Sequence, residues 1–83
     1  MDIYRKRLLY KATHRGMKET DRLIGSFAKA RMEVLSSEQL ASFDTLLDEA
    51  DNDLINWILG REEIPQRINL KLLKQIIDFD QGL

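Results

Sequence analysis

Residues that interrupt helices are scarce in this chain, which contains one proline and four glycines in 83 residues. Between these points, apolar side chains recur at intervals of three and four, the spacing of one face of an α-helix. No alternating pattern typical of a β-strand extends over more than a few residues. The composition, 43% hydrophobic and 33% charged, is that of a globular chain. We therefore predict an all-α fold, a small single-domain five-helix bundle over residues 1–83.

The spacing of the apolar residues predicts five helices around one core. Their expected ranges are residues 3–14, 17–34, 37–49, 52–59 and 66–79. The residues expected to share the core are Leu23, Phe27, Phe43, Leu47, Leu54, Trp57 and Ile76. The ordered part is expected to extend over about residues 3–79, and residues 80–83 are expected to fray at the C-terminus.

Local sequence signals mark the ends of these helices. Ser36 and Gln39 fit a capping box, and Asp51 is a favourable N-cap residue for the fourth helix. Gly16 and Gly60 follow expected helix ends, where a residue in the left-handed conformation commonly terminates a helix. Gly25 lies in the middle of the second helix, so we expect that helix to bend or to pack closely against a neighbour there.

Charge is distributed unevenly along the chain, although the net charge is only −1. Residues 1–31 contain nine Lys and Arg residues against three acidic ones, whereas residues 32–63 contain one against nine. Arg7, Lys11 and Arg15 share one side of the expected first helix. The asymmetry indicates either a basic surface for an acidic partner or two segments that pair within the fold, and the sequence leaves both interpretations open.

Most kinds of catalytic or metal site are excluded by the residue types present. The chain has no cysteine and one histidine, which excludes disulfides, thiolate sites and multi-histidine metal sites. It also lacks the common nucleophile, nucleotide-binding and zinc-protease motifs. Asp51 begins a run that is similar to a calcium loop, but Ile55 and Asn56 stand where an oxygen ligand and a glycine are required. We therefore predict no catalytic residue, no metal site and no cofactor held by this chain.

Membranes and nucleic acids are not the expected partners. No apolar run approaches the roughly 18–20 residues that span a bilayer, and no signal-peptide pattern is visible. We therefore expect a soluble protein of a reducing compartment without membrane insertion. The sequence pI of about 5.8 argues against a nucleic-acid partner. A small nucleic-acid-binding or regulatory helical module remains the alternative function, because the first helix is basic.

Residues 15–19, with the sequence Arg-Gly-Met-Lys-Glu, form the junction between the first two helices. In a purely structural interpretation, Gly16 ends the first helix and Glu19 lies in the first turn of the next. In a functional interpretation, glycine lets a partner's backbone approach closely, and Arg15 and Glu19 form a charged pair beside it. As exposed charges, Arg15 and Glu19 are expected to contribute little to stability.

This junction resembles the R-G-x-x-E signature of the succinate dehydrogenase flavinylation factors, called SdhE in bacteria and succinate dehydrogenase assembly factor 2 in mitochondria. The resemblance covers about residues 3–79. It continues, in order, through Glu19 and Asp21, Phe27, the LSSEQ segment, Phe43 with Leu46 and Leu47, and D-x-D-L-x-x-W from Asp51 to Trp57. Thr20 stands where the family usually has an apolar residue, and Asn52 where proline is common.

The resemblance implies an assembly chaperone with no active site of its own. Such a factor binds the flavoprotein subunit of succinate dehydrogenase or fumarate reductase and promotes covalent attachment of FAD to a histidine of that subunit. The FAD then belongs to the client, and we expect a monomer that binds its client one-to-one. The location is the cytoplasm in a bacterium and the mitochondrial matrix in a eukaryote.

The resemblance also implies which residues bind the partner. Arg15, Gly16 and Glu19 match its signature and are the main candidates. The further candidates are Arg7, Lys11, Met17, Lys18, Asp21 and Trp57. The spacing of Trp57 from Leu54 is typical of a core residue, whereas a tryptophan edge at the surface often anchors a partner.

Overall fold

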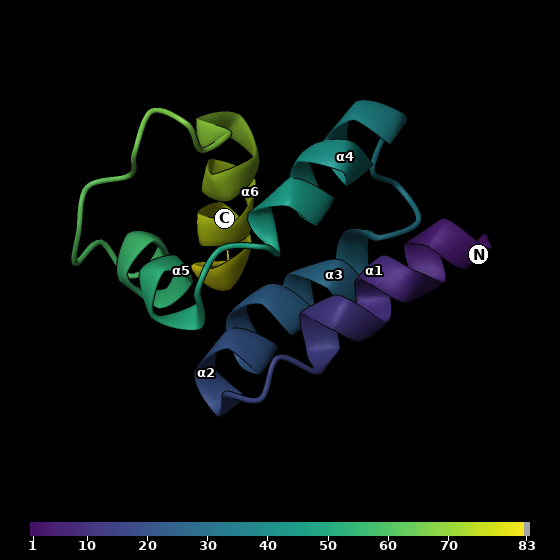
Figure 1. Ribbon diagram of the computed structural model, residues 1–83, viewed down its shortest axis with the longest axis horizontal. Coiled ribbons are helices and arrows are strands. Elements are labelled where there is room, and N and C mark those ends of the chain that lie inside the picture. The colour runs from purple at the N-terminus through teal and green to yellow at the C-terminus, as the bar shows by residue number, and fades with distance from the viewer. Residues whose placement is uncertain (83) are drawn as a thin grey trace.

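The computed structural model describes residues 1–82 as helices joined by loops (Figure 1). The elements are α1 (Ile3–Thr13), α2 (Lys18–Thr20), the π-helical turn η1 (Asp21–Gly25), α3 (Ser26–Arg31), α4 (Ser37–Leu46), α5 (Asp51–Ile58) and α6 (Leu70–Asp80). Because α2, η1 and α3 follow one another without a break, they form one continuous helix, which gives five helices. The described residues contain no strand. The predicted all-α five-helix bundle is confirmed.

The two N-terminal helices pack side by side, and the last helix joins the remaining ones to them. α1 lies along the continuous helix α2–η1–α3, and α6 contacts α3, α4 and α5 (Figure 1). Gly25 is a point of close approach, since a Cβ there would lie 3.3 Å from both the Ala12 carbonyl oxygen and the Thr13 Cγ2 atom. The close packing predicted at Gly25 is confirmed, and only glycine fits there without a shift of α1.

One hydrophobic core unites the helices. All seven residues predicted for it are buried: Leu23, Phe27, Phe43, Leu47, Leu54, Trp57 and Ile76. At its centre, the ring of Phe27 on α3 lies between two other aromatic rings. Its centroid is 6.0 Å from that of Phe43 on α4 and 5.8 Å from that of Phe79 on α6. These contacts connect α3 and α4 with α6, which lies much later in the sequence.

Local capping signals predicted some of the helix ends correctly. The capping box of α4 is confirmed, because the Gln39 N–H donates to Ser36 Oγ at 3.1 Å and the Ser36 N–H donates to Gln39 Oε1 at 2.8 Å. Gly60 follows α5 with a φ of +73°, as expected. The predicted N-cap of α5 is wrong: Ala50 is the N-cap and Asp51 is the first helical residue. The second and third helices each end three residues earlier than predicted.

The last helix differs from the prediction at both ends. It begins at residue 70 rather than 66, because the Asn69 carboxamide oxygen accepts from the Leu72 N–H at 3.0 Å and caps the helix. It ends at Asp80, whose carboxylate accepts from Arg22 Nη1 at 2.9 Å. Fraying was predicted for residues 80–83. Asp80 is the last residue of α6, and Leu83 lies outside the described residues.

Candidate functional site

The turn between α1 and α2 presents a glycine with open space in front of it. α1 ends at Thr13, and Gly16 has a φ of +93°, the left-handed conformation predicted for it. A Cβ built on Gly16 would meet no atom within 4 Å. The glycine is therefore required by its backbone conformation and not by a neighbouring group of this chain. Another molecule can approach the backbone closely at this point.

Arg15 points away from this open surface and into the fold. Its Nε donates to Asp51 Oδ1 at 2.6 Å, its Nη1 to the Leu47 carbonyl at 2.7 Å and its Nη2 to the Glu49 carbonyl at 2.8 Å. The side chain is only 11% exposed. The expected pair between Arg15 and Glu19 is wrong, as is the expectation that Arg15 is an exposed charge.

Arg15 thereby fixes the loop between α4 and α5 to the turn that contains Gly16. Leu47 is the C-cap of α4, and the carbonyl groups at a helix C-terminus lack partners within the helix. A guanidinium group satisfies them and interacts favourably with the negative end of the helix dipole. Asp51 could not be predicted as the partner of Arg15 from the sequence, because the two residues are 36 positions apart and no local pattern links them.

Replacement of Arg15 by alanine is expected to destabilise the fold, contrary to the expectation from the sequence. The free energy of unfolding should fall by about 1–3 kcal/mol, because two carbonyl groups and the Asp51 carboxylate lose their donor. Urea or thermal unfolding would measure this. Arg7→Ala is the matched control, because Arg7 is exposed on α1 and makes no ion pair within residues 1–82. Equal stability of the two variants would contradict the structural role of Arg15.

Asp21 and Thr20 support the same turn from the side of the following helix. The Asp21 carboxylate accepts from the Arg15 backbone N–H at 2.9 Å, and the Asp21 N–H donates to the Met17 carbonyl at 2.9 Å. Thr20 is completely buried, and its hydroxyl group donates to the Met17 carbonyl at 3.2 Å. The polar residue at position 20 is therefore satisfied within the fold. The turn is held by hydrogen bonds on both of its sides.

The solvent side of the turn is formed by Gly16, Met17, Lys18 and Glu19. Gly16, Met17 and Lys18 are exposed, and Glu19 is half-buried in the first turn of α2. Within residues 1–82, neither Lys18 nor Glu19 forms a side-chain hydrogen bond or an ion pair. These side chains are available to another molecule. The structure thus brings four predicted partner-binding residues together on one surface.

The basic residues predicted for one side of α1 have different environments in the structure. Arg7 is exposed, whereas Lys11 Nζ pairs with Asp44 Oδ1 at 3.1 Å. The Tyr4 hydroxyl group donates to the other oxygen of Asp44 at 3.1 Å. Partial burial, together with this hydrogen bond to a carboxylate, raises the pKa of Tyr4 above its usual value. Lys11 is therefore engaged within the fold and is not a free charge.

Three ion pairs join the basic segment to acidic residues of the later helices. Besides the pair of Lys11 with Asp44, these are Arg15 with Asp51 and Arg22 with Asp80. They support the interpretation that oppositely charged segments pair within the fold. They account for only part of the excess positive charge of residues 1–31.

Trp57 is a core residue with 4% of its surface exposed. The guanidinium carbon of Arg67 lies 5.8 Å from the centroid of its ring. This contact covers Trp57 further, and little of its surface is left for a partner. Trp57 therefore belongs to the core and is not part of the exposed turn.

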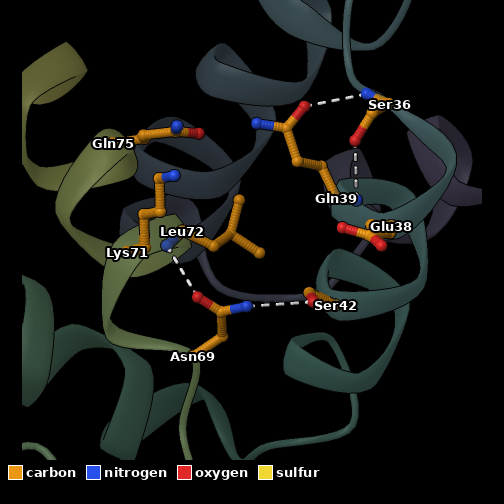
Figure 2. Close-up of a pocket in the computed structure, with 8 residues that line it drawn as sticks. All are labelled: Ser36, Glu38, Gln39, Ser42, Asn69, Lys71, Leu72 and Gln75. Carbon is orange, nitrogen blue, oxygen red and sulfur yellow. Dashed lines mark hydrogen bonds between the residues drawn. The ribbon is translucent and has the colours of Figure 1, made fainter.

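The molecule also has shallow surface pockets, one of which lies between the first turns of α4 and α6 (Figure 2). It has a volume of about 420 Å³ and is lined by Ser36, Glu38, Gln39, Ser42, Asn69, Lys71, Leu72 and Gln75. The side chains of Ser36, Gln39, Ser42 and Asn69 are occupied by the capping interactions and by the hydrogen bond from Asn69 Nδ2 to Ser42 Oγ at 3.0 Å. They stabilise helix starts, and no histidine lines the pocket to activate a serine.

Residues 1–82 contain neither a cluster of metal-ligating side chains nor a helix that could span a membrane. No three His, Asp or Glu side chains of this part of the chain are grouped so that they could hold a metal ion. None of its helices combines the length and apolar character needed to cross a membrane.

Comparison with known proteins gives a consistent result. A protein family described as "Flavinator of succinate dehydrogenase" matches residues 6–80. The mitochondrial succinate dehydrogenase assembly factor 2 of Dictyostelium discoideum is 42% identical over 72 residues, which are 87% of this chain and 51% of that protein. The FAD assembly factor SdhE of Acetobacter pasteurianus is 34% identical over 74 residues, 89% of this chain and 68% of that protein.

The Saccharomyces cerevisiae assembly factor 2 is 35% identical over 86 residues, which cover 99% of this chain and 53% of that protein. The chain thus spans about half the length of these mitochondrial relatives. No solved structure gives a significant match.

Proposed function

Because the chain belongs to the succinate dehydrogenase flavinator family, we propose that it is an FAD assembly factor for the flavoprotein subunit of succinate dehydrogenase. In this proposal it binds that subunit and promotes covalent attachment of FAD to one of its histidines. The observation that carries the proposal is the family match over residues 6–80, which includes the open turn at Gly16. The nucleic-acid alternative is not favoured by the relatives, and three of the basic residues are paired with aspartates of the later helices.

The chain acts in this proposal as a chaperone without an active site of its own. FAD and the reacting histidine belong to the client, and the factor holds mobile parts of the client in the geometry in which they react. Such positioning can account for a large part of a reaction barrier. We further propose fumarate reductase as a second possible client, a one-to-one complex with a monomeric factor, and action in the bacterial cytoplasm or the mitochondrial matrix.

The proposed contact surface is the solvent side of the turn, formed by Gly16, Met17, Lys18 and Glu19. Support comes from the open space at Gly16 and from the Lys18 and Glu19 side chains, which have no partners within residues 1–82. Arg15 and Asp21 contribute indirectly to this surface, because their hydrogen bonds within the fold hold the turn in place. Arg7 extends the positive charge along α1. Lys11 and Trp57 take no direct part in this proposal.

Coexpression with the apo-flavoprotein subunit tests the proposed function. The denatured client should show flavin fluorescence in a gel when the factor is present, and markedly less when the factor is absent, because only covalently bound FAD survives denaturation. The client alone and the client with a variant that does not fold are the two controls. Equal fluorescence with and without the factor would contradict the proposal.

Exposed basic residues are expected to speed the association with the client more than they strengthen the complex. Arg7→Glu and Lys18→Glu should each lower the association rate constant several-fold at low salt. The difference from wild type should shrink above about 0.1 M salt, where charges are screened over roughly 10 Å. Lys74→Glu on α6 is the control for a change in net charge. Stopped-flow or surface-binding kinetics would measure the association rate constants. If those of Arg7→Glu and Lys18→Glu equal that of Lys74→Glu and do not depend on salt, this steering role is contradicted.

Charge reversal at Lys11 is not suitable for this test. A glutamate at position 11 would face Asp44, so the variant would place two negative charges together and disturb the packing of α1.

A further inference from the structure

The side chain of Asp51 lies where the turn between α1 and α2 meets the loop between α4 and α5. Its Oδ1 atom accepts from Arg15 Nε at 2.6 Å, and the two side chains are 23% and 11% exposed. Asp51 is the first residue of α5, and α2 packs against that helix. One carboxylate thus connects the turn that contains Gly16 with a helix that begins 35 positions later in the sequence.

The hydrogen bonds with Asp21 and Thr20 hold the turn to the helix that follows it, but they do not connect it to the loop between α4 and α5. His14, Gly16 and Met17 are exposed, and the ring of His14 stacks on that of Tyr10 within α1. Arg15 is the exception, because its guanidinium group has three acceptors in the loop between α4 and α5. The planar guanidinium group has a fixed donor geometry, so simultaneous bonds to three acceptors define both its position and its orientation. Of these acceptors, only Asp51 carries a charge.

We propose that Asp51 is a positioning residue that acts through Arg15. It holds the turn in the conformation that the client recognises, and it makes no contact with the client itself. This inference rests on the proposed function and assigns a role to a residue outside the exposed surface. A turn that is already fixed loses little conformational freedom when the partner binds, and such preorganisation increases affinity.

The first part of the test examines the isolated protein. Asp51→Ala should broaden or shift the NMR signal of the Arg15 Nε–H group and speed amide hydrogen exchange at Gly16 and Met17. Asp51→Asn retains an oxygen acceptor and should give an intermediate result. Asp53→Ala is the matched control, because Asp53 also lies in the first turn of α5 but makes no ion pair within residues 1–82.

The second part measures the affinity for the apo-flavoprotein subunit and the yield of covalent flavin, at a temperature at which every variant is folded. Asp51→Ala should weaken binding by about 5- to 50-fold relative to Asp53→Ala, the range expected when an interface loses preorganisation. Asp51→Asn should recover part of the loss. If Asp51→Ala does not fold, Asp51→Asn alone should still bind more weakly than Asp53→Ala.

The outcomes separate this inference from the proposed function. If wild type increases flavinylation but Asp51→Ala and Asp53→Ala act alike, the positioning role is wrong and the proposed function stands. If the Arg15 Nε–H signal and the exchange rates of the turn do not change in Asp51→Ala, the positioning role is likewise overturned. If wild type neither binds the client nor increases flavinylation, the proposed function fails, and the positioning role for that client fails with it.

Discussion

Phe43→Ala is expected to lower the free energy of unfolding by roughly 3–5 kcal/mol, the usual cost of removing a buried aromatic ring. Phe43 has no exposed surface, and its ring lies 6.0 Å from that of Phe27 between centroids. Phe27 in turn contacts Phe79, so the cavity would open at the point where α3, α4 and α6 meet. A domain of this size has only about 5–15 kcal/mol of stability in total, so the variant should be close to unfolding at 37 °C.

Urea unfolding monitored by circular dichroism would measure this loss. Val34→Ala is the control, because Val34 is 72% exposed and its truncation should change stability by less than about 0.5 kcal/mol. A Phe43→Ala protein that melts cooperatively at the wild-type temperature would show that the aromatic contacts do not hold the three helices together.

Gly16→Asn is expected to leave the protein folded while it weakens binding to the flavoprotein subunit by about 10- to 100-fold. Asparagine adopts a positive φ more readily than most residues other than glycine, so it strains the backbone less than they would, and a Cβ at position 16 meets no atom of this chain. The added side chain would instead fill the space that the proposed partner's backbone requires. The measurements are the melting temperature, the affinity and the yield of covalent flavin.

Gly60→Asn is a close control for this variant. Gly60 also has a positive φ, of +73°, and also has open space where a Cβ would be placed. The two variants should have similar stability, and only the change at Gly16 should impair flavinylation. If both variants promote flavinylation of the client as well as wild type does, the turn at Gly16 is an ordinary helix junction and not a contact surface.

The features that could be predicted from the sequence are those formed by residues close together in the chain. Ser36 and Gln39 are three positions apart, and both bonds of their capping box are present. The positive φ of Gly16 and the close packing of Gly25 follow in the same way from what only glycine can do. The buried face of each helix follows from spacing, because a single core covers the apolar side of every helix.

The features that could not be predicted depend on pairs brought together by the fold. Arg15 looks like an exposed residue at a helix end, and its three acceptors are 32 to 36 positions away. The pair of Lys11 with Asp44 spans 33 positions. The start of α6 was missed for another reason: Pro65 and Asn69 are both suitable near a helix start, and the hydrogen bond of Asn69 to the Leu72 N–H decides between them.

The π-helical turn η1 has a consequence for how this family can tolerate insertions and deletions. Each residue of an α-helix rotates the chain by about 100°, and a π turn contains roughly one residue more than an α turn. Because a π turn completes about one full rotation with one residue more, deleting one residue between Asp21 and Gly25 would restore a regular helix and leave Glu19 at nearly the same angle around the helix axis relative to Phe27. The π turn thus absorbs the extra residue and keeps the angular relation between the exposed turn and the core-facing residues of α3. A sequence alignment that places a one-residue gap inside this segment is therefore compatible with the same orientation of the contact surface, where the R-G-x-x-E signature itself is intact.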